Sequence, residues 1–390
     1  MAKYRFEQIA INSTEKKKPV EEDRFTYLGL EHLDSGSLKV SRFGSDVAPI
    51  GEKLVMHKGD VLFGKRRAYQ KKVAIAPFDG IFSAHGMVLR PKEDVIDPDF
   101  FPLFISSDYF LDAAIKISVG SLSPTINWRD LKILEFDLPD LETQRKLAAV
   151  LWSIIDTMES YKKLISATDE LVKSQFMEQF GGCNYPLRSI RDLSDVVTKG
   201  TTPTTLGFEF VKSGVSFVKV ENITTTGQII KEELMHVTQE CHEKLGRSQL
   251  CEGDILFSIA GAIGRTAIVP ADVLPANTNQ ALAIIRLKKD VDVLKSYLLA
   301  ALSSPYVENQ YNDQKKGIAQ INLSLKNISD LLIPIPPLET QERFAAFVQQ
   351  SDKSKFAALR CSNLNLWSSS VILNMFQMAG KGSHLEMFAT

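Results

Sequence analysis

The feature that most constrains the fold of this chain is an internal duplication. Five short blocks of the first half recur in the second half in the same order, offset by about 190 to 197 positions. A repeat this long is too large for a solenoid unit, and it indicates two copies of one domain, each with its connector. The paired blocks are residues 27–32 and 217–222, 58–63 and 252–257, 74–77 and 267–270, 125–127 and 320–322, and 138–144 and 335–341.

Each copy opens with a strand-rich region. Residues 60–63 (DVLF) form a short run of β-branched and large apolar side chains next to a glycine, which is typical of a strand. Gly59 and Gly253, each followed by an aspartate, indicate a turn that feeds such a strand. The sequence therefore predicts an α+β chain with two similar globular domains, with helical stretches at 98–116 and 291–312.

Each copy closes with a segment that is typical of a long helix. In the first copy Pro139 precedes the segment, and Glu142 falls in the first turn, where an acidic side chain suits the helix dipole. Apolar positions then alternate at spacings of four and three, the heptad pattern of a coiled coil, until Gly181 and Gly182 end the run. The predicted helix covers residues 141–180, about 60 Å of helix. The seam consists of Leu147, Leu151, Ile154, Met158, Tyr161, Ile165, Thr168 and Val172.

The second long helix starts in the same way but has a less regular pattern. After Phe344 and Val348 the same register meets Ser351 and Lys355, and the apolar positions then shift from Phe356 onward, which indicates a stutter. Because a long amphipathic helix needs a partner for its seam, we expect the two helices to pack on each other, antiparallel. The alternative, in which each helix folds back only on its own domain, stays open. The predicted pairing positions are Leu147, Leu151, Ile154, Met158, Ile165, Val172, Phe344 and Val348.

The composition excludes several classes of protein. The 46 basic and 47 acidic side chains give a net charge of −1, which argues against a protein that is basic all over but leaves room for a local basic face. The four cysteines form no C-x-x-C pair and have no histidine at ligand spacing, so no metal site is expected. The start of the chain has no apolar signal region, and no run of about 18 apolar residues occurs, so we expect a cytoplasmic protein without a membrane span.

The sequence carries no signature of a catalytic centre. It has no G-x-x-x-x-G-K-[ST] phosphate loop, no G-x-G-x-x-G after a strand, no H-E-x-x-H and no G-x-S-x-G. Together with the duplication and the heptad seam, this favours a binding module over an enzyme.

A basic segment directly follows the strand 60–63 and is the first candidate for nucleic-acid binding. It has five cations in eight positions, which can hold phosphates, and a tyrosine and a glutamine that can contact bases. The alternative is an ordinary solvated run of charge. The candidate residues are Lys65, Arg66, Arg67, Tyr69, Gln70, Lys71 and Lys72.

The equivalent stretch of the second copy, residues 258–266, is small and nearly uncharged. The two copies therefore share scaffold motifs and differ at this loop, as expected if each reads a different sequence. Other polar loops supply the candidates here, although ordinary turn chemistry also explains them. The candidates are Lys199, Thr201, Thr202, Thr204, Arg265, Asn279, Gln280, Lys315, Lys316 and Gln320.

With these motifs the chain resembles the specificity subunit of type I restriction–modification systems. The matching motifs are Gly-Asp-[Ile/Val]-Leu-Phe in both halves, Thr-Thr-Pro-Thr after Gly200, Ile-Asn before each connector, and Pro-x-Leu-Glu-x-Gln at the start of each long helix. The resemblance covers residues 1–380. The first copy departs from it at residues 13–19, where STEKKKP stands in place of the Gly-Thr-Thr-Pro-Thr segment.

The resemblance implies a DNA-reading subunit that catalyses no reaction itself. Two target recognition domains would each bind one half of a bipartite site in double-stranded DNA, with the helices setting the gap. Two adenine methyltransferase subunits and the restriction–translocation subunits are the implied partners. S-adenosylmethionine, ATP and magnesium would belong to those partners, and this chain needs no cofactor. The implied parts are recognition domains at 1–138 and 183–335, spacer helices at 139–182 and 336–380, and a tail at 381–390 that is either disordered or a remnant of cloning.

Two other functions stay open at this point. A duplicated protein-interaction scaffold without DNA specificity explains the coiled coil equally well but makes no use of the basic segment. An enzyme with an unrecognised site, such as a nuclease joined to its own reader, rests only on scattered carboxylates.

Overall fold

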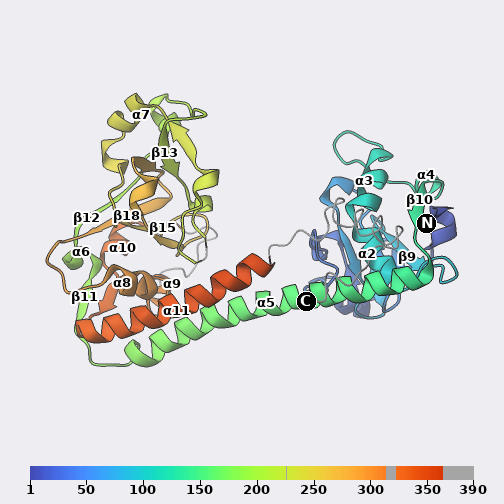
Figure 1. Cartoon of the computed structure of the whole chain (residues 1–390), viewed down its shortest axis with the longest axis horizontal. Coiled ribbons are helices and arrows are strands. Elements are labelled where there is room, and N and C mark those ends of the chain that lie inside the picture. Colours follow the sequence, from blue (N-terminus) through green and yellow to red (C-terminus); the bar gives the residue numbers. More distant parts are fainter. Residues whose placement is uncertain (225, 313–321, 363–390) are drawn as a thin grey trace. The chain divides into compact units, whose positions relative to one another are not determined.

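The chain divides into two compact units, of which unit 1 contains Met1–Ser160 and unit 2 is Tyr161–Ser362. The division falls inside one long helix, α5 (Leu141–Phe180), so each unit includes part of that helix (Figure 1). The computed structural model describes residues 1–224, 226–312 and 322–362, with side chains of the last helix as far as Lys355.

The central sheet of unit 1 is built around the strand that follows Gly59 and Asp60. Gly59 has a φ of 94°, a conformation that side chains with a Cβ rarely adopt, so glycine permits the tight turn into the strand. All three residues of that strand are buried. The four antiparallel strands, in sheet order, are β2 (Ala10–Ser13), β9 (Met87–Pro91), β6 (Val61–Phe63) and β7 (Val73–Ile75).

A second sheet and a strand pair complete the β-structure of unit 1. Neighbours in the second sheet are antiparallel, except that β4 runs parallel to β8. The strand pair joins the start of the chain to the segment just before α5. The second sheet contains β3 (Lys16–Lys17), β5 (Lys53–Met56), β8 (Gly80–Phe82) and β4 (Tyr27–Leu28), and the pair is β1 (Ala2–Arg5) with β10 (Glu135–Leu138).

Unit 2 repeats this plan. It has a four-stranded antiparallel sheet, a second sheet in which one neighbouring pair is parallel, and a strand pair that precedes a long helix. The duplication seen in the sequence is thus a duplication of topology. The sheets are β12 (Ser194–Lys199), β18 (Leu282–Leu287), β15 (Ile255–Ser258) and β16 (Thr266–Ile268); then β14 (Met235–Val237), β13 (Val215–Val218) and β17 (Ala276–Thr278); and β11 (Leu187–Ser189) with β19 (Leu332–Pro334).

The aspartate of each Gly-Asp motif has the same partner in both units. Asp60 accepts hydrogen bonds from Arg90 at 2.7 and 2.9 Å, and Asp254 accepts them from Arg286 at 2.7 and 2.7 Å. Each aspartate also accepts the backbone N–H of the residue three positions earlier, at 2.8 Å. Two-pronged arginine–carboxylate pairs are strong and directional. The motif recurs because its aspartate ties the turn to a neighbouring strand of the central sheet.

The helical stretches expected at 98–116 and 291–312 are each divided in two. A fully buried serine, Ser107 in unit 1 and Ser304 in unit 2, ends the first helix by donating its hydroxyl to the carbonyl three residues earlier at 2.6 Å. Helices therefore occupy both expected stretches, and each stretch contains two of them. The four helices are α2 (Phe100–Ser106) and α3 (Asp108–Lys116) in unit 1, and α8 (Lys295–Leu302) and α9 (Pro305–Asn312) in unit 2. Shorter helices are α1 (Phe6–Ile9), α4 (Trp128–Leu131), α6 (Ile190–Leu193), α7 (Gln239–Lys244) and α10 (Leu325–Ser329).

The last helix, α11 (Leu338–Ser362), lies alongside the end of α5 within unit 2 (Figure 1). Phe344, near the start of α11, has ring centroids 5.6 and 5.2 Å from those of Phe176 and Phe180, near the end of α5. Further along α11, Lys355 binds Asp169, which lies earlier in α5, at 2.8 Å. The two helices therefore run antiparallel, and the predicted α+β class with two long antiparallel helices is confirmed.

The apolar seam of α5 divides between the two units. Leu147 and Leu151 are buried in the core of unit 1, so this end of the helix folds back on its own domain. Val172 packs against the core of unit 2 together with Phe344 and Val348 of α11. The half-buried seam residues between these ends are Ile154, Met158, Tyr161, Ile165 and Thr168.

The glutamine that ends the repeated Leu-Glu-Thr-Gln motif is fully buried in both units. Gln144 donates to the carbonyls of Pro139 and Val95 at 2.8 and 3.1 Å, and accepts the N–H of Asp97 at 2.8 Å. Gln341 makes the same three bonds in unit 2, all at 2.8 to 2.9 Å. The glutamine therefore fastens the first turn of each long helix to the loop that precedes α2 or α8.

Among the described residues, no helix is long and apolar enough to cross a membrane. The same residues contain no group of three or more His, Cys, Asp or Glu side chains placed to hold a metal ion. Cys183, Cys241 and Cys251 are free thiols, and the side chain of Cys361 lies outside the described part.

Candidate nucleic-acid interface

The basic segment of unit 1 is a structured turn rather than a loose run of charge. Arg67 and Lys71 have φ angles of 55° and 48°, and they bracket a 3-10 turn at Ala68–Gln70. Ala68 is buried, so the segment is anchored to the core of the unit. Left-handed backbone at two non-glycine residues costs free energy, which the surrounding contacts must offset. The turn therefore presents its side chains in fixed directions.

Two of its five cations, Lys71 and Lys72, bind carboxylate or carbonyl oxygens of the domain. Lys71 donates to Asp108 and Asp112 of α3 at 2.6 and 2.8 Å, and Lys72 donates to the carbonyl of Leu30 at 2.6 Å. Burial lowers the pKa of Lys71, but the two carboxylates outweigh it and raise the pKa overall. Lys71 and Lys72 thus hold the turn in place and are poor candidates for phosphate contacts.

The remaining cations gather with others from neighbouring strands. Arg66 lies 3.2 Å from a ring nitrogen of His85. Burial, followed by the charges of Arg66, Lys65 and Lys53, lowers the pKa of His85. Burial and the charge of Lys16 lower the pKa of Lys65 in the same way. Such mutual repulsion marks a cation cluster, formed by Lys16, Lys53, Lys65 and Arg66 around His85, that an anion would stabilise.

A cleft of about 200 Å³ opens beside the cation cluster. Lys16 and Lys65 line it together with polar groups at the end of β2, namely Asn12, Ser13 and Thr14. Trp128 of α4 adds an aromatic face. Cations, hydrogen-bonding groups and an aromatic ring in one cleft suit contact with both the phosphates and the bases of DNA.

The other predicted residues of this segment remain accessible. Arg67 is exposed, Gln70 is half-buried, and the Tyr69 side chain is 56% exposed. The sequence singled out this segment as a candidate, but it did not reveal that three of its cations belong to the cluster or lie beside it and that the other two bind oxygens within the domain. Lys16, Lys53 and His85, which the structure places near the segment, were not among the predicted residues.

In unit 2 the arginine of the loop after β15 makes its hydrogen bonds within the domain. Arg265 donates to the backbone carbonyls of Val220 and Ile223 at 3.4 and 3.1 Å. The Ser258 hydroxyl accepts the N–H of Arg265 at 2.8 Å. Arg265 therefore stabilises the fold of unit 2, and its guanidinium is already engaged within the domain.

A polar cluster of unit 2 forms where β12 ends. Thr202 hydrogen-bonds Gln280, and Arg247 donates to the hydroxyl of Thr201 at 3.3 Å. Gly200 lies against the backbone of Thr278 so closely that a Cβ would fall 2.0 Å from the Thr278 carbonyl oxygen, so glycine is required. The structure thus brings together two of the predicted loops and adds Arg247, whose place in the sequence gave no signal.

The other predicted residues of unit 2 vary in their surroundings. Asn279 accepts the N–H of Ala281 at 3.1 Å, Lys199 is half-buried, and Thr204 is exposed. Lys315, Lys316 and Gln320 lie outside the described residues.

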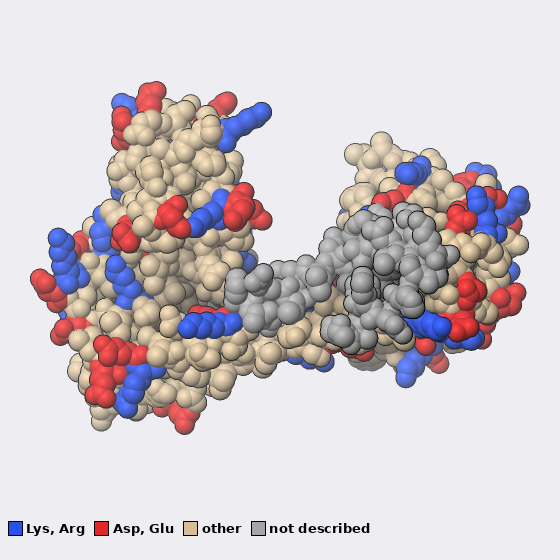
Figure 2. Space-filling model, in the orientation of Figure 1, with Lys and Arg blue, Asp and Glu red and all other residues tan. Residues whose placement is uncertain are grey.

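The two polar regions occupy equivalent places, because β2 and β12 are corresponding edge strands of the two central sheets. In unit 1 the strand leads to Thr14 and Lys16, and in unit 2 it leads to Thr201 and Thr202. The face visible in Figure 2 carries Lys and Arg beside Asp and Glu, so charge of one sign does not cover it. One scaffold therefore supports two chemically different polar surfaces, one rich in cations and one built mainly from threonine and amide side chains.

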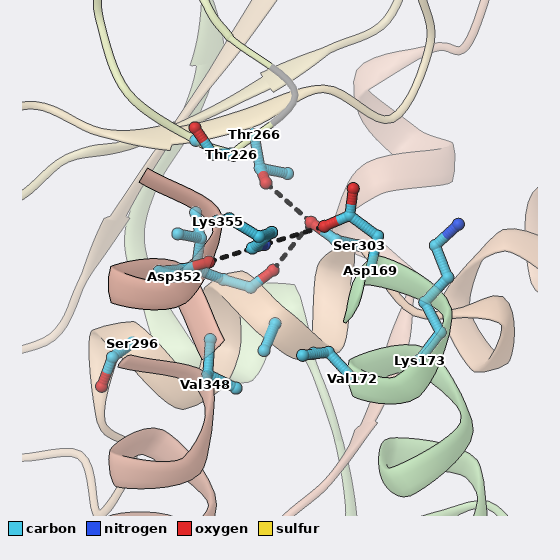
Figure 3. Close-up of a pocket in the computed structure, with 13 residues that line it drawn as sticks. Asp169, Val172, Lys173, Thr226, Thr266, Ser296, Ser303, Val348, Asp352 and Lys355 are labelled. Atoms are coloured by element: carbon cyan, nitrogen blue, oxygen red, sulfur yellow. Dashed lines mark hydrogen bonds and ion pairs between the residues drawn. The ribbon is translucent and has the colours of Figure 1, made fainter. Parts of the chain in front are cut away.

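A separate cavity of about 300 Å³ lies in unit 2 between α5, α8 and α11. Lys355 of α11 points into this region and binds Asp169 of α5 and Asp352 of α11 at 2.8 and 2.6 Å (Figure 3). The Lys355 side chain is 6% exposed. Burial lowers its pKa, but the two carboxylates outweigh it and raise the pKa overall. Because the lysine is buried while both carboxylates stay partly exposed, the triad links α5 to α11 at one defined position along the two helices.

Comparison with known proteins gives consistent results over both halves. The family model for the type I restriction modification DNA specificity domain matches residues 19–167 and again residues 185–361. The chain is similar to the type I restriction enzyme EcoBI specificity subunit of Escherichia coli, with 30% identity over 36% of this chain and 29% of that one. It is also similar to the MjaVIII specificity subunit of Methanocaldococcus jannaschii, with 22% identity over 85% of this chain and 80% of that one.

The match to EcoBI therefore spans less than a third of that subunit's length. Among solved structures, a chain from a study of the assembly and conformational transition of the type I restriction–modification system has a similar fold. The TM-score is 0.56 at 18% identity, covering 97% of this chain and 96% of the other.

Proposed function

The chain belongs to the type I restriction–modification DNA specificity family, with two target recognition domains, and on that premise we propose that each domain reads one half of a bipartite DNA site. The observation that carries the proposal is the repeated scaffold with two different polar surfaces. The Asp–Arg pairs and buried glutamines recur in both units, whereas the ends of β2 and β12 differ. Two readers with a common frame and distinct contacts give an asymmetric recognition site.

Specificity subunits are the non-catalytic members of type I systems, and this chain is one of them. We propose that it binds two adenine methyltransferase subunits and, through that core, the restriction–translocation subunits. S-adenosylmethionine, ATP and magnesium would then act in those partners, in the cytoplasm where the host DNA lies.

The proposed recognition domains are residues 1–138 and 183–335, with the long helices as the spacer that fixes the gap between half-sites. Within unit 2, the antiparallel packing of α5 and α11 and the ion triad around Lys355 support a spacer built from these two helices. Inserting or deleting whole helical turns near residues 160–165 should change the gap in the recognised site. An unchanged gap would contradict the spacer role.

The decisive experiment is methylome sequencing of a host that carries this chain with its methyltransferase. We expect one bipartite methylated motif that disappears when the chain is deleted. A chimera in which residues 183–335 come from another family member should change only one half of that motif. Methylation without any sequence preference would refute the proposal.

A salt series separates this function from that of a protein-interaction scaffold. The complex should prefer selected over random duplexes, and its affinity should fall steeply as salt increases, because phosphate contacts release counterions. A scaffold would show neither behaviour.

A further inference from the structure

We propose that Leu122, at the tip of the loop formed by residues 119–125 of unit 1, is an apolar wedge that enters the base stack of the half-site read by that unit. The inference rests on the proposed function, since it names one contact of the same DNA-reading surface. Leu122 is 94% exposed and Val119, at the base of the loop, is 65% exposed.

Exposure alone carries little weight, since single apolar residues are common on protein surfaces. The loop, however, is held in a defined shape. The N–H of Val119 donates to the carbonyl of Thr125 at 3.0 Å, and the N–H of Thr125 donates back to Val119 at 2.9 Å. Gly120 has a φ of 117°, which makes the bend possible. A closed loop therefore keeps the Leu122 side chain in solvent at its tip.

Further hydrogen bonds fasten the loop to the basic segment. The N–H of Arg67 donates to the carbonyl of Pro124 at 2.8 Å, and the N–H of Ile126 donates to the carbonyl of Lys65 at 2.9 Å. Arg66 donates from its guanidinium to the hydroxyl of Ser123 at 3.1 Å. The apolar tip is thus fixed next to the cations that would hold phosphates. Because these cations complement the negative charge of phosphates, we take duplex DNA as the partner that contacts the tip.

An apolar tip can be buried on DNA in two ways, by insertion between base pairs or by contact with a thymine methyl group. Leucine is one of the side chains that wedge into base steps, and the kink that results brings more of the backbone onto the protein. A rigid tip flanked by cations fits this mode, since the extra phosphate contacts offset the cost of unstacking. Insertion is therefore the mode that we assign to Leu122.

The test uses the assembled complex of this chain with its methyltransferase and duplexes of the methylated motif. A fluorescent adenine analogue replaces, one at a time, each adenine on either strand of the half-site except the methylated one, because fluorescence rises when a base is unstacked. We expect a rise at one step with the unaltered chain. Leu122→Ser should abolish that rise and weaken binding about tenfold, the loss expected when one buried leucine contact is removed.

Two variants serve as controls. Leu122→Met keeps an apolar tip and should retain the fluorescence rise, and Ile133→Ser changes another exposed apolar residue of unit 1 and should leave both readouts unchanged. Thermal unfolding of all three variants should match that of the unaltered chain, since the residues lie at the surface.

Several results would overturn the wedge. A fluorescence rise that persists in Leu122→Ser would do so. A loss of affinity that uracil in place of thymine reproduces would assign Leu122 to a methyl contact instead. If the unaltered complex selects no sequence at all, the proposed function itself fails. Selection that stays intact while Leu122→Ser has no effect refutes only the wedge.

Discussion

Replacing the buried glutamine of unit 2 tests the structural meaning of the repeated Leu-Glu-Thr-Gln motif. Gln341→Met keeps most of the side-chain volume and removes all three hydrogen bonds, which join Gln341 to Leu294, Asp292 and Pro336. The backbone groups of those three residues lose their partner. A buried group left without a partner costs about 1 to 3 kcal/mol. A carbonyl left without a partner costs less than an N–H in the same position. The total loss of unfolding free energy for the two carbonyls and the one N–H should therefore be about 3 to 5 kcal/mol.

A loss of this size is a large share of the stability of a domain, which is typically about 5 to 15 kcal/mol. Urea unfolding can be followed by hydrogen exchange, which reports on each unit separately through its own peptides. The urea concentration at the midpoint of unfolding should fall for unit 2, while the dependence of its unfolding free energy on urea stays unchanged. Gln144→Met makes the matching change in unit 1, and the loss should then move to unit 1. Glu342→Met alters the exposed neighbour and should cost less than about 0.5 kcal/mol. A loss below about 1 kcal/mol in both glutamine variants, or one equal to the Glu342 control, would refute the reasoning.

Three further predictions concern charge. Asp169→Ala should destabilise unit 2 by about 1 to 3 kcal/mol in urea unfolding, because the buried Lys355 then keeps only one carboxylate partner. In a Lys355→Met background the same substitution should cause no loss of stability. DNA affinity should rise as the pH falls through the pKa of His85, because burial and Arg66 lower that pKa in the free protein and a bound phosphate would raise it. His85→Asn should flatten this dependence in a binding titration, and a profile unchanged by the substitution would contradict it. In a salt series Arg66→Ala should reduce the slope of log K against log salt by about 1, whereas Lys71→Ala should reduce it much less.

The positions of the long helix and of the repeated strands could be predicted from the sequence, because the sequence patterns that indicate them are local. The bounds of α5 follow from an unbroken heptad pattern between a proline and two glycines. The repeat of Gly-Asp before a buried strand located β6 and β15. These patterns reflect backbone geometry and burial, which neighbouring residues determine.

The division of labour within the basic segment could not be predicted in this way. Lys71 binds Asp108 of α3, which lies 37 positions away in the chain, and Lys72 binds a backbone carbonyl 42 positions away. The broken helix in each unit has a similar cause, since Ser107 ends α2 through a hydroxyl bond that helical spacing does not reveal. Contacts of this kind depend on tertiary packing, which composition and periodicity do not encode.

The aromatic group formed by Phe176, Phe180 and Phe344 has a consequence for synthesis of the chain. Phe176 and Phe180 leave the ribosome well before Tyr297 and Phe344, which both pack against them, have been made. Until then the end of α5 exposes two large rings to the solvent and to other nascent chains. Unit 2 can therefore complete its core only after nearly the whole chain has emerged, and closure over so long a stretch of sequence is slow. A fragment that begins at residue 183 would lack both rings, and it should be aggregation-prone unless α5 is supplied with it.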